Sequence, residues 1–256
     1  MILVSKGDGR WRLVIDFRAV NMSIENEAVV YPRPDDILEM CQDANFMFLI
    51  DGRDFYFQRG LAEECRDPTT FRTPWGTFRW CVAPQGFKTS SAAAINPITN
   101  ELRDLIQKDI LMHCDDILGW AASERKSLAC FGEVCSRLKN FGLTLGWYKV
   151  WILKSKAQYV SFVIEGGKVT PSPKLVKSIE SLPYPSSVKE VQTFIGMIQY
   201  FALYIPMLAE MKAKLTELTL KDVVFDAIWS KDHEEACDKI RAILSDSVLY
   251  NVDWEA

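Results

Sequence analysis

The sequence lacks the features of exported, membrane-spanning and disulfide-stapled proteins. No run of 18 or more apolar residues occurs among its 256 residues, so no segment is expected to cross a membrane. Met1 is followed by a short strand-like stretch, without the basic region and apolar core of a signal peptide. The seven cysteines form no C-x-x-C pair, and their odd number argues against a complete disulfide framework, so we expect reduced and mostly buried thiols. These absences favour a protein of the cell interior.

A basic surplus is also missing, as are internal repeats and low-complexity segments. The formal net charge is -4, whereas contacts to nucleic-acid phosphates need a basic surface. Any nucleic acid must therefore meet a local basic patch. What the chain does have is 48% apolar residues, which is ample for buried cores, and a length that suits one large domain or two to three smaller ones.

Apolar runs and turn residues predict a mixed α+β domain in the first two thirds of the chain. A continuous apolar run of strand length, Phe46–Ile50, ends at Asp51. Two shorter runs, Ile110–Cys114 and Ile117–Trp120, predict a hairpin with an acidic pair at its tip, though without the usual glycine. We expect helices on one face of a mostly antiparallel sheet and a free opposite face for a ligand. The other expected elements are a hairpin over 1–21, a short helix opened by Asp35 and Asp36, strands over 55–61 and 77–82, a helix over about 90–108, and an amphipathic helix between Ser123 and Gly142.

The character of the chain changes after residue 170. Closely spaced prolines punctuate the start of this region, namely Pro171, Pro173, Pro183 and Pro185. Ser187 and Glu190 form a capping box that opens a helix expected to run to about Tyr204. Further helices near 208–219 and 230–245 complete a separate helical module.

Three carboxylates are the strongest chemical feature of the sequence. If the strand that ends at Asp51 lies beside the hairpin that carries Asp115 and Asp116, the three side chains meet at one edge of the sheet. Like charges at that range need cations, and hard oxygen ligands favour Mg²⁺ or Mn²⁺. Two such ions can clamp the attacking and leaving oxygens of a phosphoryl displacement. The alternative is a polar hairpin turn next to an ordinary strand end.

Five motifs, in order along the chain, carry a resemblance to one family. They are Trp11–Asn21 (WRLVIDFRAVN), Phe71–Gly76 (FRTPWG), Pro84–Lys88 (PQGFK), His113–Asp116 (HCDD, where the family has Y-x-D-D) and the segment from Val188 to Pro206. Over nearly its whole length the chain resembles the polymerase region of a reverse transcriptase, in particular those of long-terminal-repeat retrotransposons related to Ty3 and gypsy. The resemblance implies a right-hand polymerase of α+β class. Its parts would be partial fingers at 1–31, a ferredoxin-like palm at 32–170 with a finger insertion around 57–95, and a helical thumb with the start of a connection at 171–256.

The resemblance also implies roles for individual residues. Asp51 and Asp115 would be direct ligands of two Mg²⁺ (or Mn²⁺) ions, with Asp116 as their partner, and Gly52 would lend a backbone carbonyl to a metal. One ion would activate the primer 3′-hydroxyl and the other would hold the triphosphate. The expected residues around the incoming dNTP are Lys6, Arg12, Asp54, Phe55, Tyr56 and Gln85.

Each role around the dNTP has a plainer alternative. Arg12 would donate a bidentate pair of hydrogen bonds to phosphate oxygens, and Lys6 would be a second cation there. The alternative is that both residues are surface charges. Tyr56 would lie under the deoxyribose and exclude a 2′-hydroxyl by its bulk, or it is a core aromatic. Gln85 would contact the 3′ side of the nucleotide, or it is a polar loop residue. Lys149 lies where some polymerases place a basic residue near the pyrophosphate, but we expect a solvated lysine.

Contacts to the primer are expected from two segments. The hairpin that begins at Tyr159 and ends near Val169 resembles the one that grips the primer, with Tyr159, Val160 and Ser161 as contact residues; the alternative is an ordinary hairpin. His113, before the acidic pair, is the other expected contact.

Several positions depart from the family pattern. His113 replaces a tyrosine, and Phe55 replaces a small residue, so its ring would crowd the sugar pocket unless it turns away. Ser161 stands for a glycine and adds a Cβ where the family keeps the backbone freedom of glycine. The remaining departures are Ser91 and Ile95 in place of Pro and Gln, and Ala202 and Leu203 in place of two arginines.

The sequence therefore predicts an RNA-directed DNA polymerase that adds dNTPs to a primer on an RNA or DNA template. The chain is expected to be a piece of a polyprotein with ribonuclease H and integrase regions once adjacent, located in the cytoplasm or in a virus-like particle. A decayed copy that keeps the fold as a binding or structural module is the main alternative. A polymerase that copies RNA into RNA is another, but Tyr56 speaks against it, because such an enzyme should not exclude a 2′-hydroxyl.

Overall fold

The computed structural model describes residues 2–5, 9–220 and 225–249. The chain forms two compact units. The first comprises Met1–Pro32 with Asn45–Lys154, and the second comprises Arg33–Ala44 with Ser155–Ala256. This division separates residues 33–44 and 155–170 from the rest of the segment that we expect to form the palm. In the described part of the chain, no helix is both long and apolar enough to cross a membrane.

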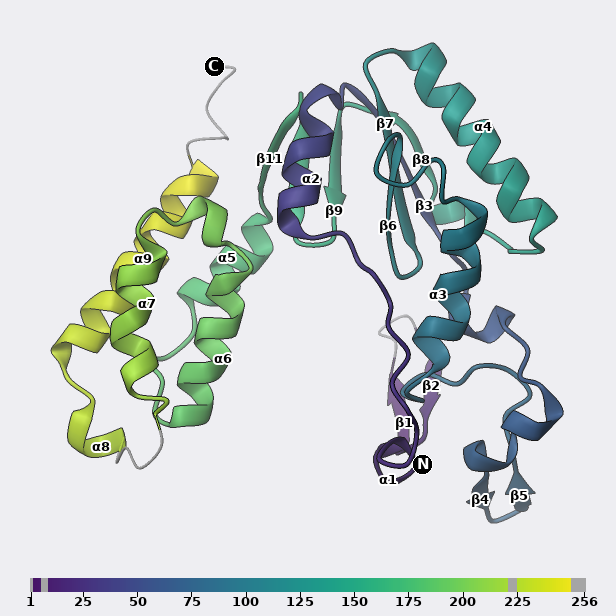
Figure 1. Ribbon diagram of the computed structural model, residues 1–256, viewed down its shortest axis with the longest axis horizontal. Coiled ribbons are helices and arrows are strands. Elements are labelled where there is room, and N and C mark those ends of the chain that lie inside the picture. The colour runs from purple at the N-terminus through teal and green to yellow at the C-terminus, as the bar shows by residue number, and fades with distance from the viewer. Residues whose placement is uncertain (1, 6–8, 221–224, 250–256) are drawn as a thin grey trace. The chain divides into compact units, whose positions relative to one another are not determined.

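The first unit is built around a four-stranded antiparallel sheet in the order β6-β7-β3-β8 (Figure 1). Two smaller hairpins, β1-β2 and β4-β5, accompany it. The strands are β1 (Ile2–Ser5), β2 (Trp11–Val14), β3 (Phe46–Asp51), β4 (Phe71–Thr73), β5 (Gly76–Phe78), β6 (Ile110–His113), β7 (Asp116–Ala121) and β8 (Trp151–Lys154). The helices are α1 (Arg18–Asn21), α3 (Ser90–Glu101) and α4 (Glu124–Asn140).

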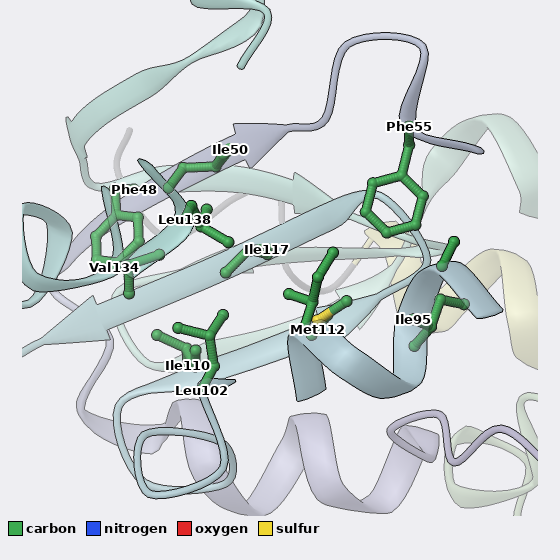
Figure 2. Close-up of a cluster of buried hydrophobic side chains, with 12 residues drawn as sticks. Phe48, Ile50, Phe55, Ile95, Leu102, Ile110, Met112, Ile117, Val134 and Leu138 are labelled. Carbon is green, nitrogen blue, oxygen red and sulfur yellow. The ribbon is translucent and has the colours of Figure 1, made fainter. Parts of the chain in front are cut away.

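The core of the first unit lies between one face of this sheet and the helices α3 and α4 (Figure 2). Alternate residues of β3, such as Phe48 and Ile50, point to this face because successive side chains of a strand alternate. Val134 and Leu138, four residues apart on α4, pack against them. Gly119 on β7 makes room for a ring, since a Cβ there would lie 2.0 Å from Phe48 Cζ. Helices on one face of an antiparallel sheet are what the sequence predicts.

The opposite face of the sheet is not free for a ligand, so that expectation is wrong over the central strands. Met47, Leu111 and Leu118 occupy the alternate positions and are almost completely buried. The run Phe46–Ile50 is apolar without interruption, which is typical of a strand buried on both faces. A ligand must therefore bind at the edge of the sheet.

Three other predicted elements differ in the structure. The expected strand over 55–61 is a 3₁₀ helix, Phe55–Gln58, because Asp54 turns the chain with a left-handed φ of 46°. Helix α3 ends at Glu101 and cannot reach Lys108, since Gln107 has φ 64°. The expected strand over 77–82 is confined to β5, and β8 is an unpredicted edge strand.

The second unit contains a three-stranded antiparallel sheet in the order β11-β10-β9 and a set of helices. Ser187 Oγ accepts from Glu190 N (3.3 Å), as predicted, but the Glu190 carboxylate accepts from Ser186 rather than from the cap residue. The helix that follows ends at Gln199, before the expected Tyr204. The elements are α2 (Pro34–Met40), β9 (Lys156–Tyr159), β10 (Phe162–Glu165), β11 (Lys168–Pro171), α5 (Pro173–Glu180), α6 (Val188–Gln199), α7 (Leu208–Glu217), α8 (Phe225–Ile228) and α9 (Lys231–Leu249).

Candidate active site

The structure brings the three predicted carboxylates together at one end of the sheet. Asp51 is the last residue of β3 and pairs in register with Asp116, the first residue of β7. One residue further on, Gly52 N donates a hydrogen bond to the carbonyl of Asp115 (2.9 Å). Adjacent antiparallel strands thus hold a strand end against a hairpin tip, which is the arrangement expected from the sequence.

The hairpin tip itself is strained. His113 pairs with Asp116, which leaves Cys114 and Asp115 as a two-residue loop. Tight loops of this length need positive φ, and Cys114 takes φ 55° although it is not a glycine. A left-handed non-glycine residue costs on the order of 1–3 kcal/mol and persists where neighbouring structure fixes it. The hydrogen bond from Gly52 is one such constraint, so the backbone presents Asp115 in one orientation.

Burial and mutual repulsion raise the pKa of both hairpin carboxylates. Desolvation is the main cause for Asp116, followed by the charges of Asp115 and Asp51, and its pKa rises to about 6. Desolvation also raises the pKa of Asp115, and the charge of Asp51 adds to the effect. The ring of His113 is held by Tyr31, with centroids 4.9 Å apart, and burial lowers the pKa of the imidazole. The site therefore concentrates negative charge that is only partly solvated.

Lys149 supplies the cation that faces these carboxylates. Its Nζ lies 2.7 Å from Asp51 Oδ2, and this hydrogen bond raises the pKa of the lysine. Leu145 bridges to Gly52, and Gly146 N donates to the carbonyl of Asp51 (3.2 Å), so the segment before Lys149 is anchored on the end of β3. Lys149 is exposed, as expected of a solvated lysine, but it also pairs with Asp51, because backbone anchoring that the sequence did not reveal brings it to the site.

A cleft of about 440 Å³ opens beside the carboxylates. Acidic groups line part of it, and the guanidinium groups of Arg10 and Arg12, from the β1-β2 hairpin, line another part. Its other lining residues are Val4, Ser5, Asp51, Gly52, Arg53, Asp54, Phe55, Tyr56, Gln85, Asp115, Tyr148 and Lys149. A cleft with carboxylates and guanidinium groups together suits a polyphosphate bound through a divalent cation.

Most of the predicted dNTP-binding residues therefore share one cleft. Arg12 is exposed, and Gln85 and Tyr56 are half-buried. Asp116 and His113 are not part of its lining. Lys6 lies outside the described residues. Arg10, Tyr148 and Lys149 were missed as cleft residues; the one available signal was a glycine followed by aromatic and basic residues after the amphipathic helix. A larger cleft, about 580 Å³ and lined mainly by α7, lies in the second unit and contains none of these residues.

Phe55 does not crowd the cleft with its ring. The side chain is only 4% exposed and turns into the core beneath the site, close to Ile95 (Figure 2). This orientation depends on Gly52, because a Cβ there would lie 2.8 Å from the Phe55 ring. Two departures from the family pattern, Phe55 and Ile95, are thus accommodated as core residues.

Tyr56 belongs to a small polar cluster under the hairpin tip that the sequence did not predict. Burial is the main cause that raises the pKa of Tyr56, while a hydrogen bond with Ser91 lowers it and Cys114 raises it. Burial also raises the pKa of Tyr31 to about 12, with Cys114 contributing. Two phenol groups, a thiol and a hydroxyl thus lie close together around Tyr56.

The predicted primer-contact hairpin lies in the second unit. Tyr159 is 1% exposed, so its side chain offers no surface to a ligand in this conformation. The left-handed residue of the turn is Val160, with φ 54°, and not Ser161. The expected strain of a Cβ at Ser161 is therefore absent, and Val160 and Ser161 are the partly exposed members of this turn.

The donor set at the carboxylates fits a divalent cation in type. Asp51, Asp115 and Asp116 supply hard oxygen ligands, and burial, followed by the neighbouring carboxylates, raises the pKa of Asp115 and Asp116. Across the described residues, no group of three or more His, Cys, Asp or Glu side chains is yet spaced to hold a metal ion. Metal binding would therefore require a shift of these side chains and release of Asp51 by Lys149.

Comparison with known proteins gives consistent matches. Residues 4–164 match the protein family described as Reverse transcriptase (RNA-dependent DNA polymerase). The Retrovirus-related Pol polyprotein from transposon 297 of Drosophila melanogaster is 28% identical over 252 residues, covering 98% of this chain and 24% of that protein. The polyprotein from transposon gypsy of the same organism is 26% identical and covers 83% of this chain and 20% of its own length. The chain thus spans about a quarter or less of these relatives.

Solved structures with the same fold come from foamy virus. The foamy viral protease-reverse transcriptase in complex with double-stranded DNA superposes with a TM-score of 0.81 at 21% identity, over 96% of this chain and 43% of that chain. The same protein in complex with an RNA/DNA hybrid gives a TM-score of 0.75 at 21% identity, over 95% of this chain and 33% of that chain. At this identity the likeness establishes the fold, and it confirms the predicted α+β polymerase architecture.

Proposed function

The chain belongs to the reverse transcriptase family, and we propose that it is the polymerase core of an RNA-directed DNA polymerase. The reaction is the addition of dNTPs to the 3′-end of a primer. The observation that carries the proposal is the meeting of Asp51, Asp115 and Asp116 at one sheet end, beside a cleft that also presents arginines. In this proposal the fingers, palm and thumb occupy 1–31, 32–170 and 171–256.

In this proposal some residues of the cleft bind the metal ions and others position the substrates. Asp51 and Asp115 would hold two Mg²⁺ or Mn²⁺ ions, with Asp116 beside them and the Gly52 carbonyl as a further oxygen. When bound, the metal lowers the pKa of the primer hydroxyl and neutralises the charge of the leaving pyrophosphate. Arg12 donates to phosphate oxygens, and catalysis is mainly positioning and electrostatic stabilisation.

The same cleft accounts for selection of the sugar and for product release. Tyr56, held by Ser91 and Cys114, presents its ring to the sugar and excludes a 2′-hydroxyl by bulk. Gln85 contacts the 3′ side of the nucleotide. Lys149, which pairs with Asp51 here, would be available to pair with a phosphate if the metal ions took its place on Asp51.

The partners are a primer and an RNA or DNA template. The foamy viral enzyme has been solved with double-stranded DNA and with an RNA/DNA hybrid, which supports both kinds of duplex as ligands of this fold. The relatives are polyproteins, which supports a location beside ribonuclease H and integrase regions in a longer protein, in the cytoplasm or in a virus-like particle. His113 and the turn at Val160 and Ser161 contact the nucleic acid.

A second candidate is a decayed copy that keeps the fold without activity. Ala202 and Leu203 in place of the family's arginine pair favour it, as does the net charge of -4, because both weaken contacts to phosphate. The burial of Phe55 and the relaxed backbone of Ser161 remove two arguments for it.

Primer extension on a poly(rA)/oligo(dT) template with Mg²⁺ or Mn²⁺ decides between these functions. The unmodified chain should extend the primer with dTTP, and Asp115→Asn should reduce extension by at least about 100-fold, since the variant loses a charge that holds the metal. A folded chain that does not extend the primer would establish the decayed copy. If Asp115→Asn extends the primer as fast as the unmodified chain does, the proposed role of the carboxylates in catalysis is wrong.

A further inference from the structure

Large aromatic side chains lie exposed next to the carboxylate cleft. Trp147 is 65% exposed, Tyr148 is 67% exposed and Trp151 is 51% exposed, all within five consecutive residues. Burying such a side chain stabilises a fold, so leaving three of them in solvent forgoes a sizeable contribution. None of the proposed catalytic roles uses these rings. Exposed apolar groups gathered in one place mark an interaction surface.

The backbone places this aromatic segment beside the cleft. Trp147 and Tyr148 lie in the 3₁₀ helix that Gly146 anchors on the carbonyl of Asp51. Tyr148 lines the same cleft as Asp51. Because Trp147 and Trp151 are four residues apart, their Cα atoms are within about 14 Å of each other. The exposed rings therefore begin at the cleft and continue away from it along the edge strand β8.

An irregularity in β8 adds a cation to the same surface. Leu49 pairs with Trp151 and Met47 with Lys154, so β8 carries one extra residue, and Leu153 takes φ 54°. Residues three apart on a regular strand point to opposite faces, but this bulge brings Lys154 back to the side of Trp151. Its Nζ lies 4.9 Å from the centroid of the Trp151 ring.

The charge of the segment around these rings suits an anionic partner, although the net charge of the whole chain does not. The chain has a net charge of -4, yet residues 141–164 contain Lys149, Lys154 and Lys156 and no Asp or Glu. Lys149 is engaged with Asp51 and Lys156 with Glu165, which leaves Lys154 beside the Trp151 ring as the cation of this surface. Flat aromatic faces interleaved with lysines are the composition of surfaces that bind single-stranded nucleic acid, where bases stack and phosphates meet cations.

We propose that Trp147, Tyr148 and Trp151, with Lys154, form a stacking surface for the unpaired bases of a single-stranded segment of nucleic acid next to the carboxylate cleft. The inference rests on the proposed function, since it names a further binding surface for the nucleic acid used there. Stacking needs free base faces, so the surface selects unpaired nucleotides over a duplex. It is also tolerant of sequence, because every base has a π-face.

The test compares aromatic with aliphatic replacements. Binding of a short fluorescein-labelled oligo(dT) single strand is followed by fluorescence anisotropy at low salt. The double variant Trp147→Leu/Trp151→Leu should bind at least about 5-fold more weakly, since the loss of each stacked base weakens binding by about 5- to 150-fold. Trp147→Phe/Trp151→Phe should bind within a few-fold of the unmodified chain, because a phenyl ring still stacks. Met22→Ala, at an 83% exposed position of the same unit, is the matched control.

The two double variants also distinguish base stacking from apolar contact. If the leucine variant binds as tightly as the unmodified chain, or if the phenylalanine variant binds as weakly as the leucine variant, the proposal is wrong. In the second case the surface makes apolar contacts, as a docking site for protein would. Unfolding is excluded by circular dichroism and by an unchanged affinity for a blunt duplex.

Binding of the single strand is independent of catalysis. Asp115→Asn should bind the single strand as the unmodified chain does while losing primer extension. If the unmodified chain binds oligo(dT) through these rings but extends no primer, the proposed function fails and the stacking surface stands. If the unmodified chain extends the primer but the leucine variant binds oligo(dT) as tightly as the unmodified chain does, the proposed function stands and the stacking surface fails.

Discussion

Three carboxylates share one ammonium group at the end of β3. Lys149 pairs with Asp51, whereas neither Asp115 nor Asp116 forms an ion pair with a residue in the described part of the chain. Their raised pKa values follow mainly from desolvation and then from the neighbouring charges. Without a metal, ionised Asp116 should therefore destabilise the fold, as functional groups often do.

Replacing Asp116 with asparagine should stabilise the metal-free chain. The pKa of Asp116 is raised from 3.8 to about 6, so its protonated form stabilises the fold below its ordinary pKa, and this contribution is lost as the pH rises through 6. At pH 7.5 Asp116→Asn should raise the free energy of unfolding by about 1–2 kcal/mol, after a discount for partial exposure. The gain should shrink as the pH falls from 7 to 4. Urea unfolding with a chelator present measures it, and no gain at pH 7.5 would show that ionised Asp116 does not destabilise the fold.

Tyr56 is the residue on which sugar selection depends. Its ring lines the cleft and is held from below by Ser91 and Cys114. Tyr56→Ala should open space for a 2′-hydroxyl and lower the preference for dTTP over UTP by about 10-fold or more, with Tyr56→Phe as the control that keeps the bulk. Single-nucleotide incorporation rates give the ratio. Equal use of both nucleotides by the unmodified chain would refute assignment of Tyr56 as the gate.

At the scale of elements, β7 packs closely against β3 at Gly119. A Cβ at Gly119 would lie 2.0 Å from the Phe48 ring, which the buried core cannot easily move. Gly119→Ala should therefore lower the free energy of unfolding by about 1–3 kcal/mol. Gly132→Ala on α4 meets nothing within 4 Å and should raise it by up to about 1 kcal/mol. Chemical unfolding of both variants checks the pair; a neutral Gly119→Ala would contradict the packing of this layer.

The elements that carry the carboxylates could be predicted because their signals are local. A strand-length apolar run before Asp51 and two runs around the acidic pair predict the strand and the hairpin, and the structure shows that the two are adjacent. The 3₁₀ helix at Phe55–Gln58 could not be predicted, because its sequence resembles a strand. The left-handed φ at Asp54, which no local pattern signals, turns the backbone before this segment. The approach of Lys149 depends on hydrogen bonds between residues nearly 100 positions apart, which no local pattern reveals.

At the scale of the whole molecule, the acidic balance opposes binding of a polyanion. The 3₁₀ helix Ala202–Tyr204 in the second unit carries alanine and leucine where the family pattern has two arginines, and Leu203 is 57% exposed. Ala202→Arg/Leu203→Arg should tighten binding of a primer-template duplex. Each new phosphate contact adds about 0.9 to the steepness of log affinity against log salt, so two add nearly 2. Filter binding over a salt series measures the slope, and an unchanged slope would show that this helix does not meet the duplex.

The carboxylates Asp51, Asp115 and Asp116 are proposed to hold the metal ions of a nucleotidyl transfer, and every other role depends on them. Single-turnover extension of a labelled primer by one nucleotide, titrated with Mn²⁺, tests this most directly. The unmodified chain should show extension that saturates with Mn²⁺ and disappears with a chelator. Asp51→Asn should lose at least about 100-fold in rate and require more Mn²⁺. Extension that persists in chelator, or an Asp51→Asn variant with the same rate and the same Mn²⁺ dependence, would contradict the metal-binding role of these residues.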